Sequence, residues 1–129
     1  MTRPEYAPGQ AWTYRTRPGA EASTVVIRKK DVEPEDGEVF HISILGANLR
    51  NHRVDGGLQR SMHHAAVARS TLDQSLLEYI GDGDGDEAWM DGYDVWRQAY
   101  DNGDAGIFDI PVADILGYIE MVIASSGER

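Results

Sequence analysis

Hydrophobic and polar positions alternate most regularly over residues 38–46, Glu-Val-Phe-His-Ile-Ser-Ile-Leu-Gly. Side chains along a strand point to opposite faces in turn, so Phe40, Ile42 and Ile44 share one face. This face is wholly apolar, and we expect it to lie on a hydrophobic core. The opposite face is mixed and carries Val39, His41, Ser43 and Leu45.

Three further segments have the alternation and composition of strands, namely 11–17, 23–32 and 58–67. Short turns at 17–20 and 33–37 join the first three strands. Such turns favour antiparallel pairing, because parallel neighbours need a longer crossover. The pattern predicts an antiparallel meander of three or four N-terminal strands, and it leaves open whether they curl into a barrel.

The later part of the chain has the apolar spacing of helices. Ser70 and Asp73 fit a capping box, from which a helix is predicted to continue to Ile80. Two more helices are predicted over 87–100 and over 111–123. The predicted fold class is therefore α+β, with about three C-terminal helices covering the strands.

A chain of 129 residues is long enough for one domain with its own core. We expect a single domain over 1–129. Its predicted parts are an irregular lead-in over 1–9, a β half over 10–67, an acidic helical half over 68–124 and a frayed tail over 125–129.

Charge divides the chain unevenly. Residues 1–69 carry 10 Lys and Arg against 8 Asp and Glu, a balance of +2, whereas residues 70–129 carry 2 against 14, a balance of −12; together they give the net charge of −10. The acidic half repels phosphate backbones, so no nucleic acid partner is expected. It attracts basic surfaces.

The chain has no cysteine, and its first residues have no apolar run of the kind found in signal peptides. No apolar segment approaches the length of a membrane span. These features predict a cytoplasmic protein with no membrane partner and no cofactor.

The second predicted helix has two different faces. Its aromatic stripe, Trp89, Tyr93, Trp96 and Tyr100, is typical of core packing, with a recognition surface as the alternative. Its other face and the loop before it are acidic. The residues predicted to bind a partner are Asp82, Asp84, Asp86, Glu87, Asp91, Asp94 and Asp101.

An alternative site is the mixed sheet face with His41, Ser43 and His64, which could serve a small-molecule binder or an enzyme. Catalysis by Ser43 would require a base within hydrogen-bond reach, itself oriented by a third group. The chain contains no Gly-x-Ser-x-Gly elbow, phosphate loop or His-Glu-x-x-His motif. No catalytic residue is therefore assigned, and the balance favours a protein that is not an enzyme.

Asp82, Asp84 and Asp86 alternate as the first ligands of calcium loops do. The sixth and twelfth positions of such a loop hold Glu87 and Tyr93 in place of glycine and glutamate, so a solvated loop is favoured. Zinc at the histidines would require three converging ligands, and a set of His41, one of the adjacent pair 63–64 and Asp55 depends on strand register. No metal site is predicted.

The run from Pro8 to Gly19, Pro-Gly-Gln-Ala-Trp-Thr-Tyr-Arg-Thr-Arg-Pro-Gly, resembles small uncharacterised bacterial proteins, as do Ser23-Thr24 and Val39–Ser43. The resemblance continues later in the chain and covers most of it. It implies a bacterial context and brings no activity, ligand or catalytic residue. Its later residues are His64, Leu72-Asp73-Gln74-Ser75 and Ala105-Gly106-Ile107-Phe108.

The charge asymmetry decides the functional prediction. We expect a non-enzymatic acidic protein that docks on a basic surface of a partner protein, as a toxin-neutralising (immunity-type) protein or a regulatory protein does.

Overall fold

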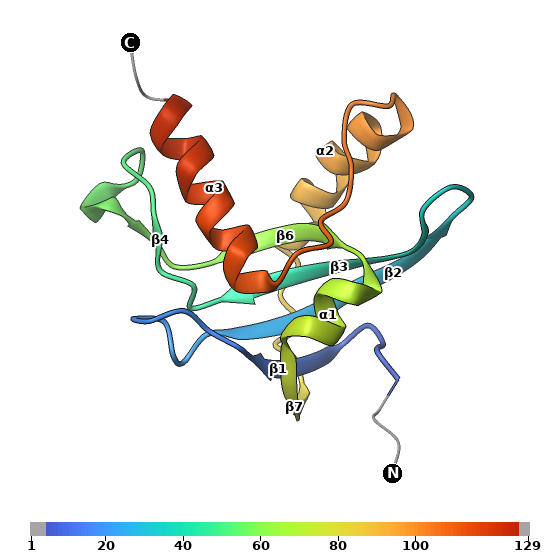
Figure 1. Ribbon diagram of the computed structural model, residues 1–129, viewed down its shortest axis with the longest axis horizontal. Coiled ribbons are helices and arrows are strands. Elements are labelled where there is room, and N and C mark those ends of the chain that lie inside the picture. The colour runs from blue at the N-terminus through green and yellow to red at the C-terminus, as the bar shows by residue number, and fades with distance from the viewer. Residues whose placement is uncertain (1–4, 127–129) are drawn as a thin grey trace.

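A five-stranded antiparallel sheet forms the middle layer of the computed structural model, which describes residues 5–126 (Figure 1). The strand order is β6-β3-β2-β1-β7, so β6 and β7 are the two edges and the described sheet does not close into a barrel. This confirms the predicted α+β class. The strands are β1 (Gln10–Tyr14), β2 (Thr24–Glu33), β3 (Gly37–Leu45), β6 (Met62–Val67) and β7 (Leu76–Asp82).

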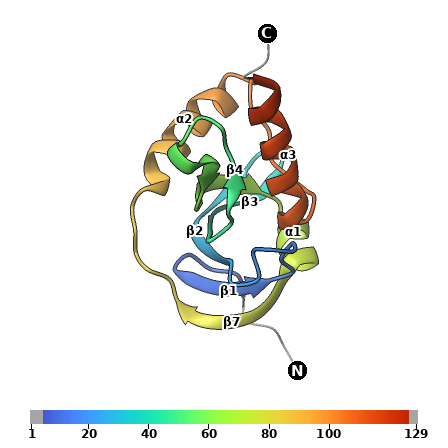
Figure 2. The same ribbon diagram turned by 90° about the vertical axis from the view of Figure 1, so that its left-hand side faces the viewer.

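Helices cover both faces of the sheet (Figure 2). α1 (Arg69–Ser75) and α3 (Val112–Ser126) lie on one side, and α2 (Trp89–Asp101) lies on the other. On the side of α1 and α3, the apolar face of β3 is completely buried, as its alternation predicted. The centre of this core consists of Phe40, Ile42, Ile44, Leu72, Ile115 and Leu116.

A β-bulge at Arg28 reverses the alternation within β2. Ile27 lies before the bulge and faces the core, whereas Lys29 lies after it, opposite His41 on the face that α2 covers. The extra residue shifts the phase of the strand by one position. Asp31 therefore points toward α2, although a strict period of two would place it with Ile27.

The prediction for the first helix is wrong in the length of the helix and in its N-terminal cap. α1 ends at Ser75, and its N-cap is Ala68, which makes no side-chain cap hydrogen bond. The capping box predicted from Ser70 and Asp73 is therefore absent. Instead, the Ser75 hydroxyl accepts the backbone N–H of Val112 at 2.9 Å and so ties α1 to the start of α3.

Residues 76–80, predicted as helix, form most of the edge strand β7 because β1 offers them an unpaired backbone edge. An exposed strand edge leaves N–H and C=O groups without protein partners, and pairing satisfies them. Tyr79 lies opposite Trp12, with ring centroids 5.7 Å apart, and the backbone N–H of Glu78 donates to Thr13 Oγ1 at 3.0 Å. These contacts outweigh the helical spacing of the segment.

The predicted fourth strand, 58–67, is interrupted. Its second part forms β6, whereas its first part pairs with the segment after β3 in a separate small sheet. Gly46, at φ +67°, turns the chain away after β3, so residues 47–53 do not continue that strand. The small sheet consists of β4 (Leu49–Arg50) and β5 (Leu58–Gln59), joined through the 3-10 helix η1 (Asp55–Gly57).

The structure describes only parts of the predicted lead-in and tail. Residues 5–9 are irregular, and residues 1–4 and 127–129 lie outside the described range. α3 continues to Ser126, so residues 125 and 126 of the predicted tail are helical. Within the described residues, none of the helices has the length and apolar character needed to cross a membrane.

Candidate functional site

The aromatic stripe of α2 packs on the mixed face of the sheet. The rings of Tyr93 and Trp96 meet the imidazole of His41 edge-on, with centroids 4.7 Å and 4.8 Å from it. His41 has no exposed surface as a result. The stripe therefore serves as packing, the first of the two readings of the sequence, although every residue of α2 keeps some exposure.

Gly92 allows α2 to lie this close to the sheet. A Cβ atom at this position would lie 2.8 Å from the Cβ of His64, on β6, which is closer than two carbon atoms approach. A larger residue at this position would push α2 away from β6. The close packing therefore requires glycine, although glycine destabilises the helix by about 1 kcal/mol relative to alanine.

Asp31 is the polar centre beneath α2. Its Oδ2 atom accepts hydrogen bonds from Tyr93 Oη at 3.0 Å and from the Arg97 guanidinium at 3.1 Å, both on α2. The same oxygen lies 3.0 Å from His41 Nε2 on β3. One carboxylate thus joins two strands of the sheet to the helix that covers them, and Arg97 also pairs with Glu33.

The two predicted histidines are in direct contact. His41 Nδ1 lies 2.9 Å from His64 Nε2. Because His41 Nε2 faces the Asp31 carboxylate, the hydrogen-bond pattern assigns its proton to Nε2 and leaves Nδ1 to accept the N–H of His64. The result is a continuous hydrogen-bond network of side chains from Asp31 through His41 to His64.

Both imidazoles are held neutral. Burial lowers the pKa of His64 to about 4, and the neighbouring His41 adds to this effect. Burial also lowers the pKa of His41; Asp31 opposes the shift, and the charges of Arg97 and Lys29 reinforce it. For Asp31, burial acts to raise the pKa, but the hydrogen bond from Tyr93 and the neighbouring cations lower it more.

These shifts predict a loss of stability in acid. An unfolded histidine takes up a proton near pH 6.5, whereas folded His64 takes one up only near pH 4. The contribution of His64 is therefore fully present above about pH 6.5 and is lost as the pH falls toward 4. The difference in pKa sets an upper limit of about 3.4 kcal/mol, and the partial exposure of the ring reduces the expected loss to about 2 kcal/mol.

Urea unfolding at several pH values between 7.5 and 4.5 measures this loss. We expect His64→Gln to flatten the pH dependence of the free energy of unfolding, whereas His52→Gln, which replaces an exposed histidine, should leave the dependence unchanged. An identical pH dependence in the wild type and His64→Gln would contradict the assignment.

Ser43 is separated from the histidine pair. Its hydroxyl donates to the backbone carbonyl of His63 at 2.7 Å and accepts a hydrogen bond from Arg28 Nε at 2.8 Å. The three residues of the alternative sheet-face site thus divide into a coupled pair and a serine held elsewhere. The arrangement of base and nucleophile that catalysis by Ser43 requires is not formed.

The acidic loop before α2 is fixed to the sheet by an ion pair. Asp84 Oδ1 lies 2.8 Å from Arg28, whose side chain is almost completely buried. Gly83 lies against Val26, and Trp89 closes one side of a cavity of about 260 Å³ beside the loop.

Over residues 5–126, no three Asp, Glu or His side chains converge as metal ligands, so the structure does not assemble the calcium candidate Asp82, Asp84 and Asp86 or the zinc set with Asp55.

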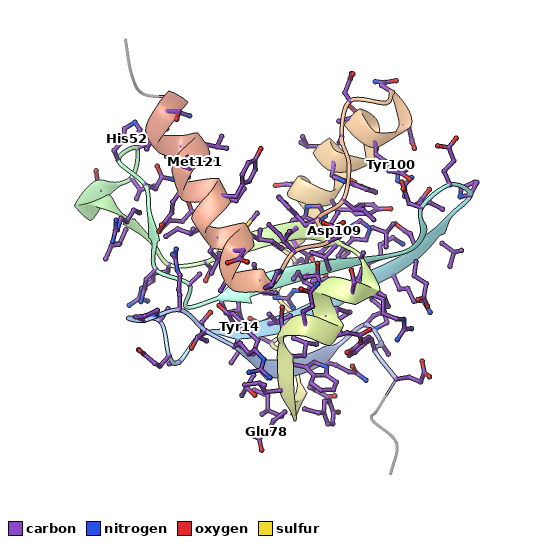
Figure 3. All side chains as sticks on the ribbon, viewed as in Figure 1. Tyr14, His52, Glu78, Tyr100, Asp109 and Met121 are labelled. Atoms are coloured by element: carbon purple, nitrogen blue, oxygen red, sulfur yellow. The ribbon has the colours of Figure 1, made fainter. Side chains whose placement is uncertain are left out.

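The predicted partner-binding residues lie close together along the chain, and we call them the acidic face. All seven are exposed, at the end of β7, on the loop that follows it and on α2. Figure 3 shows Tyr100 at the far end of α2, close to the β2–β3 hairpin, where its hydroxyl donates to Asp36. The acidic face consists of Asp82, Asp84, Asp86, Glu87, Asp91, Asp94 and Asp101.

Sequence reasoning missed Asp31, Arg97 and Gly92 as parts of this site. The bulge concealed the direction of Asp31, and nothing local in the sequence marks it. Arg97 carried a signal, because it is the one cation predicted on α2 and lies one turn from Tyr93 on the inward side.

Comparisons with protein-family models, curated proteins and solved structures found no match.

Proposed function

We propose that the protein is a non-enzymatic binding protein whose acidic face docks on a basic surface of a partner protein. One observation carries the proposal: α2 turns its aromatic stripe onto the sheet and leaves its carboxylates exposed together with those of the preceding loop. A field of one sign over a continuous surface attracts a partner of the opposite charge and speeds association.

Apolar residues among the carboxylates favour a protein partner. Val95 is 71% exposed on α2, and Met90 is also exposed. Interfaces combine a small apolar centre with a polar rim, and these two side chains supply apolar contacts inside the acidic face. A role in neutralising a basic toxin, as immunity proteins do, or in regulating a basic protein is consistent with such a surface.

Affinity capture of the tagged protein from a lysate of its own cells tests the proposal. We expect a stoichiometric basic protein to be retained at low salt and to be shed or weakened at high salt, because salt screens attraction between exposed charges. Retention of nothing at either salt, or of a partner whose binding is insensitive to salt, would contradict it.

A second candidate function is supported by the hydrogen-bond network that joins Asp31, His41 and His64. Such a chain can orient an imidazole and stabilise its charged form, as in acid–base catalysis, and His64 is only partly buried. This candidate predicts small-molecule binding or turnover that His64→Ala and His41→Ala abolish. Full ligand affinity or turnover in either variant would eliminate it.

A further inference from the structure

An apolar groove lies outside the acidic face, between the segment after α2 and the helix α3. Its volume is about 390 Å³. Figure 3 labels Asp109 below α2, where this segment descends toward the start of α3. The residues that line the groove are Gly106, Ile107, Phe108, Ile110 and Tyr118.

The wall formed by residues 106–110 is held rigidly in place. The backbone N–H of Phe108 donates to Ala66 O of β6 at 2.9 Å, and its carbonyl accepts the N–H of Ala68, the N-cap of α1, at 2.8 Å. Trp96 Nε1 donates to Gly106 O at 2.9 Å. The groove is therefore formed before any partner arrives, and a preformed groove reduces the entropic cost of binding.

The opposite wall is an exposed aromatic ring. Tyr118 is 47% exposed, and its ring meets that of Phe108 edge-on at 5.9 Å. Met121, which is 59% exposed, and Val122 follow at i+3 and i+4, so the apolar surface continues along α3. A contiguous apolar surface of this kind on a small protein is characteristic of an interaction site.

Three acidic residues are close neighbours of the lining residues along the chain. Asp109 stands between two lining residues, Asp114 lies one helical turn before Tyr118, and Asp104 precedes the segment; all three are exposed. With a net charge of −10, a second copy of the chain or an anionic membrane would meet repulsion here. Charge complementarity points to a cationic occupant.

We propose that this groove binds a cationic amphipathic segment of another protein. An apolar side chain of that segment packs in the groove against the joined rings of Phe108 and Tyr118, and flanking Lys or Arg side chains pair with Asp109 and Asp114. Helix-in-groove recognition has this form, with apolar anchors at helical spacing. The site is separate from the acidic face and does not depend on the function proposed above.

The test uses a designed helical peptide of leucine and lysine, with leucines along one face, titrated into the isotope-labelled protein and followed by amide NMR shifts. We expect saturable shifts in residues 106–110 and 114–122. Tyr118→Ser should weaken binding about tenfold, since it removes about 1.4 kcal/mol of apolar contact. Tyr79→Ser, which removes an equally exposed tyrosine (46%) from β7, is the matched control and should leave affinity unchanged.

A second variant separates charge from shape. Asp109→Asn with Asp114→Asn retains the apolar walls, and we expect it to weaken the peptide at low salt and to reduce the salt dependence of binding. A peptide with glutamate in place of lysine should not bind. Shifts confined to the acidic face, or Tyr118→Ser and Asp109→Asn/Asp114→Asn proteins that both bind as the wild type does, would overturn the proposal.

Discussion

Reversing two charges on α2, Asp91→Lys with Asp94→Lys, is expected to weaken partner binding at low salt by about 100-fold or more. Both side chains are exposed on the acidic face. The change replaces attraction to a basic surface by repulsion, and like charges brought together at an interface cost several kcal/mol. The affinity for the captured partner, measured by calorimetry at low and high salt, gives the size of the effect.

A control with the same change in net charge separates local docking from general attraction. Asp55→Lys with Glu78→Lys also moves the net charge from −10 to −6, since each substitution adds two charges. Figure 3 shows Glu78 at the end of the molecule opposite α2. We expect this control to bind within about threefold of the wild type. Equal losses in both double variants would mean that net charge, and not the acidic face, determines binding.

Replacing Asp31 by alanine is expected to lower the free energy of unfolding by about 3 kcal/mol. The substitution leaves the buried N–H of His41 without its acceptor and removes the bonds from Tyr93 and Arg97 that tie α2 to the sheet. A buried donor left unsatisfied costs its full desolvation, and hydrogen bonds to charged groups are stronger than neutral ones. Urea unfolding followed by tryptophan fluorescence measures the loss.

Two variants make the Asp31 result specific. Asp31→Asn keeps a hydrogen-bond acceptor, and we expect it to lose about half as much stability. Glu35→Ala removes an exposed carboxylate from the β2–β3 turn and should change stability by less than about 0.5 kcal/mol. An Asp31→Ala protein as stable as Glu35→Ala would show that the network beneath α2 contributes nothing to the fold.

The parts of the fold that the sequence predicted are those whose local pattern agrees with their packing. The apolar face of β3 is completely buried, as its alternation predicted, and α2 covers 89–101 where a helix was expected over 87–100. In these segments burial and backbone preference favour the same structure, so local reasoning suffices.

The prediction for β7 was wrong and the role of Asp31 was missed, because both depend on residues that are distant in the sequence. The apolar residues of 76–80 fit helical spacing, but the free edge of β1, more than sixty residues earlier, takes them as a strand. The direction of Asp31 depends on the bulge at Arg28, which no local pattern indicates. The pairing of His41 with His64 was a possibility that required the register of β3 and β6.

Amide hydrogen exchange of the protein alone and with its captured partner maps the docking surface onto the chain and so tests whether the acidic face forms it. We expect slower exchange over 82–101 in the complex, with residues 76–81 of β7 and the small sheet of β4 and β5 unchanged. Slower exchange confined to β7 or to β4 and β5, with α2 exchanging as in the free protein, would contradict the claim that the acidic face is the docking surface.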